Sequence, residues 1–117
     1  MTEHYSQNKS GAVVDTNLDG VIVNTDGDAV ETRDFRNISV FMTGTVSAAA
    51  TATAAVVVEG SHDGSFAGEE VTLDTTTFVS GASGDTDIFS TSAHIPFMRV
   101  SATLSAADIT AVITAGN

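Results

Sequence analysis

Apolar and polar residues alternate along most of the chain, in short runs that Gly, Asp, Asn and Ser separate. In the run 37–43, Ile38, Val40 and Met42 fall on one side of an extended backbone, and the residues between them fall on the other. A period of two is the signature of a β-strand. We therefore predict eight short strands, at residues 12–14, 21–24, 37–43, 53–59, 71–78, 87–90, 96–103 and 109–115.

The residues between these runs are typical of tight turns. Asp19-Gly20, Asp26-Gly27 and Asp63-Gly64 each place a glycine where a hairpin turn needs a positive φ. Segments with a helical period are nearly absent. About eight short strands at this spacing indicate an all-β fold, either a sandwich or a closed barrel. We predict a single-domain antiparallel β-sandwich of jelly-roll type over residues 12–117, preceded by a polar, flexible N-terminal arm at residues 1–11.

One segment near the C-terminus is open to two interpretations. Residues 105–108, Ser-Ala-Ala-Asp, have the form of a helix capping box. The run that follows, 109–114, is rich in β-branched residues, which favour a strand over a helix. We predict a turn followed by a final strand.

The charge of the chain limits its partners. Fifteen acidic and four basic residues give a formal charge of −11. The four basic residues, Lys9, Arg33, Arg36 and Arg99, do not cluster in the sequence. Binding to nucleic acid or to an anionic membrane needs clustered Lys and Arg, so we predict neither partner. No apolar run approaches the ~20 residues of a transmembrane helix, and no signal peptide is apparent, so we expect synthesis in the cytoplasm.

Large side chains for a core are few. Hydrophobic residues make up 42% of the chain, but many are Ala, and there is no Trp and only one Tyr. A thin core suggests that an oligomer interface supplies further burial. The six phenylalanines that we expect in the core are Phe35, Phe41, Phe66, Phe78, Phe89 and Phe97.

Residues 15–26, DTNLDGVIVNTD, have the residue pattern of a twelve-residue calcium loop. Such a loop places oxygen ligands at positions 1, 3, 5, 7, 9 and 12, with Gly at position 6. The pattern resembles the loops of EF-hand and dockerin proteins over these residues alone. The expected ligands are Asp15, Asn17, Asp19, Val21 through its carbonyl, and Asp26, with Asp28 as a further carboxylate to test.

The same residues are also typical of a hairpin turn. An EF-hand loop joins two helices, and both flanks here are predicted strands. Asp26 is shorter than the bidentate Glu that such loops usually carry, and Val23 at position 9 offers no side-chain ligand. We interpret residues 17–20 as a turn between two strands, predict no cofactor, and keep calcium binding as the alternative.

Catalytic motifs are missing from the sequence. It has no Cys, no nucleophile elbow and no glycine-rich phosphate loop. His4, His62 and His94 lie far apart, and Glu69-Glu70 is typical of a solvated face. We therefore predict no enzymatic activity.

The segment 56–66, VVVEGSHDGSF, resembles a pattern of small structural proteins of tailed bacteriophages, in which a strand ends in V-E-G-S-x-D-G before an aromatic residue. Residues 34–40, DFRNISV, and residues 95–100, IPFMRV, resemble the strands before and after it in those proteins. The resemblance covers about residues 34–115, which is most of the chain.

This resemblance implies a non-enzymatic β-sandwich protein of the virion. The expected role is a decoration (cement) protein on the capsid surface, which binds the major capsid protein as a homo-oligomer, a trimer by expectation. Two alternatives stay open. One is a tail or head–tail accessory protein, and the other is a calcium-dependent, carbohydrate- or partner-binding module.

Overall fold

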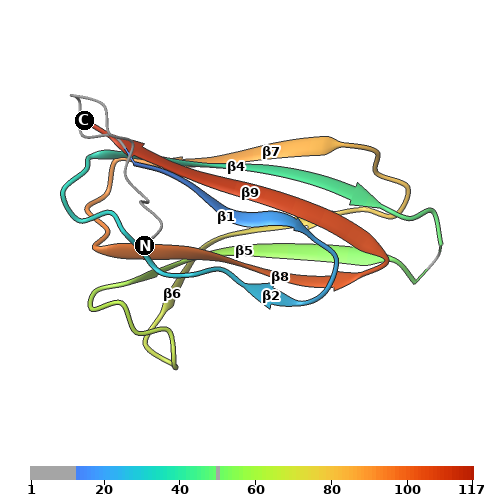
Figure 1. Cartoon of the computed structure of the whole chain (residues 1–117), viewed down its shortest axis with the longest axis horizontal. Helices are drawn as coiled ribbons and strands as arrows, with labels where there is room; N and C mark the ends of the chain where they lie inside the picture. The colour runs from blue at the N-terminus through green and yellow to red at the C-terminus, as the bar shows by residue number, and fades with distance from the viewer. Residues whose placement is uncertain (1–12, 50) are drawn as a thin grey trace.

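Nine strands in two antiparallel sheets form the computed structural model, which describes residues 13–49 and 51–117 (Figure 1). No helix occurs in these two ranges. Sheet I contains, in spatial order, β1 (Val13–Val21), β9 (Ala107–Gly116), β4 (Asn37–Val46) and β7 (Asp85–Thr91). Sheet II contains β2 (Thr25–Asp26), β8 (Phe97–Ser105), β5 (Thr53–Ser61) and β6 (Val71–Phe78), and β3 (Val30–Glu31) also pairs with β8.

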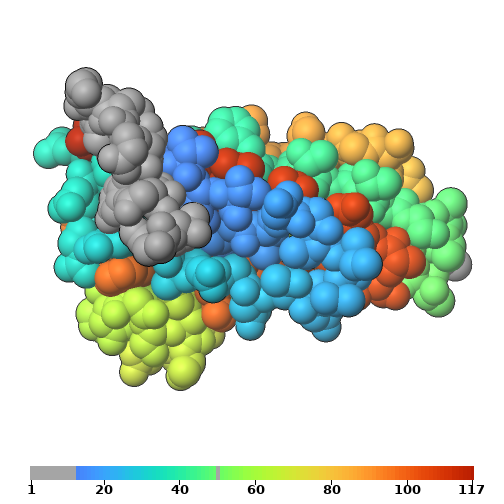
Figure 2. Space-filling view, viewed as in Figure 1, coloured from blue at the N-terminus to red at the C-terminus, as the bar shows by residue number. Residues whose placement is uncertain are grey.

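The strand order is that of a jelly roll. β2 and β3 pair with successive parts of β8, so they act as one interrupted strand. Counting them once, strands 1-8-3-6 of sheet I face strands 2-7-4-5 of sheet II, as two interleaved Greek keys require. In Figure 1 sheet I lies above sheet II, and in Figure 2 the segment from β1 to β3 covers the side of the sandwich that faces the viewer. The predicted antiparallel sandwich of jelly-roll type is confirmed.

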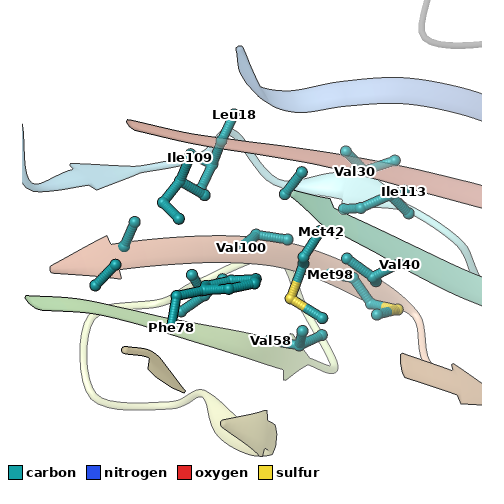
Figure 3. Close-up of a cluster of buried hydrophobic side chains, with 14 of the residues drawn as sticks. Leu18, Val30, Val40, Met42, Val58, Phe78, Met98, Val100, Ile109 and Ile113 are labelled. Carbon is teal, nitrogen blue, oxygen red and sulfur yellow. The ribbon is translucent and has the colours of Figure 1, made fainter. Parts of the chain in front are cut away.

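The hydrophobic core fills the space between the two sheets (Figure 3). Ile38, Val40 and Met42 are buried as predicted, because alternate side chains of a strand point to the same face. The aromatic residues behave differently from our prediction: Phe35 and Phe78 are buried, whereas Phe41 is 46% exposed. The largest fully buried side chains are Leu18, Ile38, Met42, Met98, Ile109 and Ile113.

The C-terminal segment is a strand, as predicted. β9 begins at Ala107 and pairs with both β1 and β4 in the centre of sheet I. Ala106 has a φ of 56°, which turns the chain sharply from β8 in sheet II to β9 in sheet I. Its carbonyl accepts a hydrogen bond of 2.9 Å from the Ser47 amide. The β-branched composition therefore outweighed the capping-box pattern.

The predicted turn at residues 17–20 is wrong. β1 continues through this segment to Val21 and pairs with β9, with irregular register around Leu18. Leu18 is 1% exposed, so burying it in the core favours the extended chain over a turn. Gly20 has a φ of +59°, which fits an irregular strand as well as a turn. The chain reverses at residues 22–24 instead.

The other two Asp-Gly pairs differ from each other. Asp26-Gly27 makes no hairpin, because β2 and β3 both continue along β8, and the Gly27 amide donates a hydrogen bond of 2.8 Å to the Val100 carbonyl. Gly64 has the predicted positive φ, +85°, but it lies in the long connection between β5, which ends at Ser61, and β6, which begins at Val71, so the tight hairpin turn predicted at Asp63-Gly64 is wrong.

The predicted arm at residues 1–11 lies outside the described residues. Val57 is only half-buried on the outer face of sheet II, whereas its neighbours Val56 and Val58 are buried in the core. Within the described ranges, no helix is long and apolar enough to cross a membrane.

Candidate interaction surface

The outer face of sheet I carries a row of side chains that crosses all four strands. Thr16 of β1 lies opposite Val112 of β9, Val112 lies opposite Phe41 of β4, and Phe41 lies opposite Ile88 of β7. Phe41 is 46% exposed and Ile88 is 57% exposed. Directly opposed side chains on one face of a sheet lie within contact distance. The row therefore forms an exposed apolar stripe on the outside of the sandwich.

The residues around this stripe are uncharged. They alternate with the buried residues of their strands, which places them on the outer face of sheet I. Asp85 and Asp87 alternate with Thr86 and Ile88 along β7 and therefore point to the other side of the sheet. Asp19, which is exposed directly after the buried Leu18, and Asp108 at the start of β9 stand at one end of the face. What we call the uncharged face consists of Val14, Thr16, Ser39, Phe41, Thr43, Thr86, Ile88, Ser90, Thr110, Val112 and Thr114.

Hydroxyl groups of the uncharged face bond partly to one another. The Ser39 and Ser90 hydroxyls lie 3.1 Å apart, and the Thr114 hydroxyl donates to the Ser39 carbonyl at 3.4 Å. The Thr110 hydroxyl accepts from the Gly20 amide at 3.0 Å. These hydrogen bonds join neighbouring strands and hold the hydroxyl groups of the face in fixed positions.

The outer face of sheet II is charged, in contrast. Arg99 on β8 pairs with Glu59 on β5, with 2.8 Å between Nε and Oε1, and lies over the Phe66 ring at 4.5 Å. Arg33 pairs with Glu31 at 2.6 Å and lies over the Phe97 ring at 5.0 Å. Both arginines therefore form ion pairs within the domain.

The phage-like motif at residues 56–66 has a structural explanation. Glu59 holds Arg99, and Phe66 covers the guanidinium. The Asp63 carboxylate accepts hydrogen bonds from the Ser65 amide at 2.9 Å and from the Ser61 hydroxyl at 3.1 Å. The bond from the Ser65 amide, followed by that from Ser61, lowers the pKa of Asp63 below its ordinary value of 3.8. The motif therefore builds a turn and an ion pair.

Asn17, a predicted calcium ligand, holds three segments together. Its Nδ2 donates to the Asp15 carboxylate at 3.0 Å and to the Asp28 carbonyl at 2.8 Å. Its Oδ1 accepts from the Val100 amide of β8 at 2.7 Å. A Cβ on Gly27 would lie 1.9 Å from that Oδ1, so only glycine leaves room for the side chain. We call this arrangement the Asn17 clip.

The remaining predicted ligands contact other parts of the fold. Asp15 is 7% exposed in β1. Asp26 accepts a hydrogen bond of 2.8 Å from Ser101 on β8, and Val21 lies opposite Ile109 on β9. Asp19 is exposed near the end of β1. Among residues 13–49 and 51–117, no group of three or more His, Asp or Glu side chains is placed to hold a metal ion. Calcium binding by these residues stays a prediction.

Two histidines that are distant in the sequence lie together in space. His62 and His94 line one largely apolar hollow at an end of the sandwich, together with Glu69, Leu73 and Ile95. The sequence did not predict this proximity, because it arises from the pairing of β5 with β6 and β8. His4 lies outside the described residues.

The fold and this surface define an all-β jelly-roll protein with one charged and one uncharged sheet face. No family model and no curated protein matches the chain. Among solved structures it is similar to the SPBc2 prophage-derived protein YomS, with a TM-score of 0.65 and 12% identity, over 91% of this chain and 93% of the other. That likeness shows that the chain shares its fold with a prophage-derived protein.

Two further similarities are more distant. A Bacillus endospore appendage, from a family of disulfide-linked pili, matches with a TM-score of 0.46 and 9% identity, over 100% of this chain and 97% of the other. The infectious bursal disease virus Gx strain matches with a TM-score of 0.39 and 10% identity, over 92% of this chain and 32% of the other. Neither score is high enough to support an argument about function.

Proposed function

We propose that the chain is a non-enzymatic structural protein of a phage virion, and that it binds the outer capsid lattice as a decoration (cement) protein. The observation that carries this proposal is the uncharged face, an exposed sheet surface with an apolar stripe on an otherwise acidic jelly roll. Exposed apolar surface on a soluble protein indicates a binding site for a macromolecule. The fold shared with a prophage-derived protein supports the phage setting.

The net negative charge of the chain favours a place on the outer surface of the capsid. A chain of charge −11 is repelled by packaged DNA, so a place in the interior of a filled capsid is unfavourable. Its partner would be the major capsid protein, which presents the same site many times on the lattice. A rigid sandwich that buries surface across neighbouring subunits ties them together, and a symmetric homo-oligomer matches lattice symmetry. No ligand or cofactor is needed for this role.

Purified particles of the phage that encodes the chain provide the test. We expect quantitative mass spectrometry to find the chain in a fixed ratio to the major capsid protein, in separated heads. A non-structural protein of the same lysate serves as the control and should disappear during purification. Recovery in the tail fraction would support a tail accessory role instead, and loss of the chain together with the control would contradict a virion role.

A further inference from the structure

We propose that the uncharged face binds a second copy of this chain, so that two jelly rolls pack sheet I against sheet I around a two-fold axis. The stripe formed by Val112, Phe41 and Ile88 would lie at the centre of this interface. The pairing concerns the free chain. The uncharged face cannot contact a second copy and the capsid at once, so binding to the lattice would separate the two copies, and the pairing and the capsid role are tested separately.

The distribution of charge selects this face for self-association. Two chains of charge −11 repel each other, and the repulsion between exposed charges acts over a Debye length of about 8 Å at physiological salt. Contact through the outer face of sheet II would bring Asp26, Glu31 and Glu59 of each copy toward the same groups of the other. Arg33 and Arg99 neutralise these carboxylates only in part, since there are three acidic groups and two arginines. Contact through the uncharged face brings no like charges together, apart from Asp19 and Asp108 at one end of it.

The chemistry of the face is complementary to itself. Its polar members are Ser and Thr, and a hydroxyl group both donates and accepts hydrogen bonds. A surface of hydroxyl and apolar groups can therefore meet an identical surface without leaving two donors or two acceptors opposed. A foreign partner with basic groups would be attracted to the acidic remainder of the surface instead. This argument favours a second copy as the occupant.

The size of the face is close to what a stable pair needs. Four strands spaced about 4.8 Å apart and about nine residues long cover about 19 Å by about 30 Å before side-chain relief is added. A standard interface buries about 800 Å² on each partner. Face-to-face packing of two sheets about 10 Å apart, rotated by about 30°, is an ordinary arrangement. Val14, Phe41 and Ile88 are each about half exposed in the single chain and would become buried.

An isologous interface predicts a closed dimer, because both copies use the same patch and no such patch stays free to bind a third copy. The sequence-based expectation was a trimer, which no observation tests. A trimer around a three-fold axis would join two different patches of each copy, and the uncharged face on its own supplies a single self-matching patch.

The test is the native mass of the full chain by light scattering after size-exclusion chromatography. We expect twice the chain mass of 11.9 kDa for the wild type, and the single chain mass for Phe41→Asp and for Ile88→Asp. Val71→Asp is the matched control, because Val71 is 63% exposed on β6 of sheet II, and this variant should remain dimeric. Circular dichroism and thermal melting should show that every variant is folded.

Salt distinguishes this interface from a charge-mediated one. Raising the salt concentration screens the repulsion between the two acidic copies, so we expect the dimer to become tighter, whereas an interface held by ion pairs would weaken. A monomeric wild type, a stable trimer, or a dimer that persists in both Phe41→Asp and Ile88→Asp would overturn the proposal. None of these outcomes would decide the capsid role, because the virion measurement does not depend on the state of the free chain.

Discussion

Replacing Gly27 with alanine is expected to lower the free energy of unfolding by about 3 kcal/mol, the cost of forcing a methyl group into a filled site. The new Cβ would lie 1.9 Å from the Asn17 Oδ1 and 3.0 Å from the Val100 carbonyl oxygen. Asn17→Ala should cost a similar amount, since it removes three hydrogen bonds worth about 1 kcal/mol each. Chemical denaturation monitored by circular dichroism measures both losses.

The double variant tests whether the two residues act through each other. Asn17→Ala removes the atom with which the Cβ at position 27 collides, so we expect the double variant to be little less stable than Asn17→Ala alone. Asn37→Ala, at an exposed asparagine of β4, is the matched control and should change stability by less than about 0.5 kcal/mol. Simple addition of the two losses would contradict the clip.

Replacing Ile113 with alanine is expected to cost about 2–5 kcal/mol, the range for truncating a fully buried isoleucine. Ile113 is 0% exposed at the centre of β9, and its neighbours across sheet I are Val40 and Asp15. β9 is hydrogen-bonded to β1 on one side and to β4 on the other, so the backbone cannot easily move to fill the cavity that the substitution leaves. The midpoint of urea unfolding, with an unchanged slope, would report this loss.

The next residue along the same strand provides the control. Val112 points outward, so Val112→Ala should cost less than about 1 kcal/mol when both variants are compared in the monomeric Ile88→Asp background, because little buried surface is lost there. Equal losses for the two variants would contradict the assignment of the inner and outer faces of sheet I.

The sequence predicted the fold class because alternation of apolar and polar residues is a local signal. The run 37–43 shows it clearly, and its inner residues are buried as expected. The turn predicted at residues 17–20 was wrong because Asp, Asn and Gly at this spacing favour a turn locally. The structure instead pairs the segment 15–21 with β9, about 90 residues later. Burial of Leu18 and pairing with β9 are long-range effects that a local pattern cannot reveal.

The uncharged face could be predicted only in part. The sequence placed Ser39, Phe41 and Thr43 on one side of a strand, but Phe41 was assigned to the core on account of its size. The neighbouring strands determine which side of a strand faces water. The strand order β1-β9-β4-β7 cannot be deduced from the sequence pattern of any single strand. A usable signal was the scarcity of charged residues in the runs 38–46 and 109–116.

The calcium ligands predicted at residues 15–26 are a second case in which a local pattern did not predict the structure. Asp, Asn and Gly at close spacing suit a metal loop, a turn and a buried hydrogen-bond clip equally well. The structure uses Asn17 and Gly27 as such a clip, which joins β1 to β8 and to the connection between β2 and β3. The distinction needed the position of the Val100 amide, which lies 83 residues away in the chain.

The most direct test of the proposed function is binding to capsid shells. Shells assembled from the major capsid protein of the same phage would be mixed with the purified chain and sedimented. We predict saturable recovery of the chain in the pellet, at a fixed ratio to the capsid protein, and a higher melting temperature of the shells carrying it. A chain that stays in the supernatant at every concentration, with no change in shell stability, would contradict a decoration role.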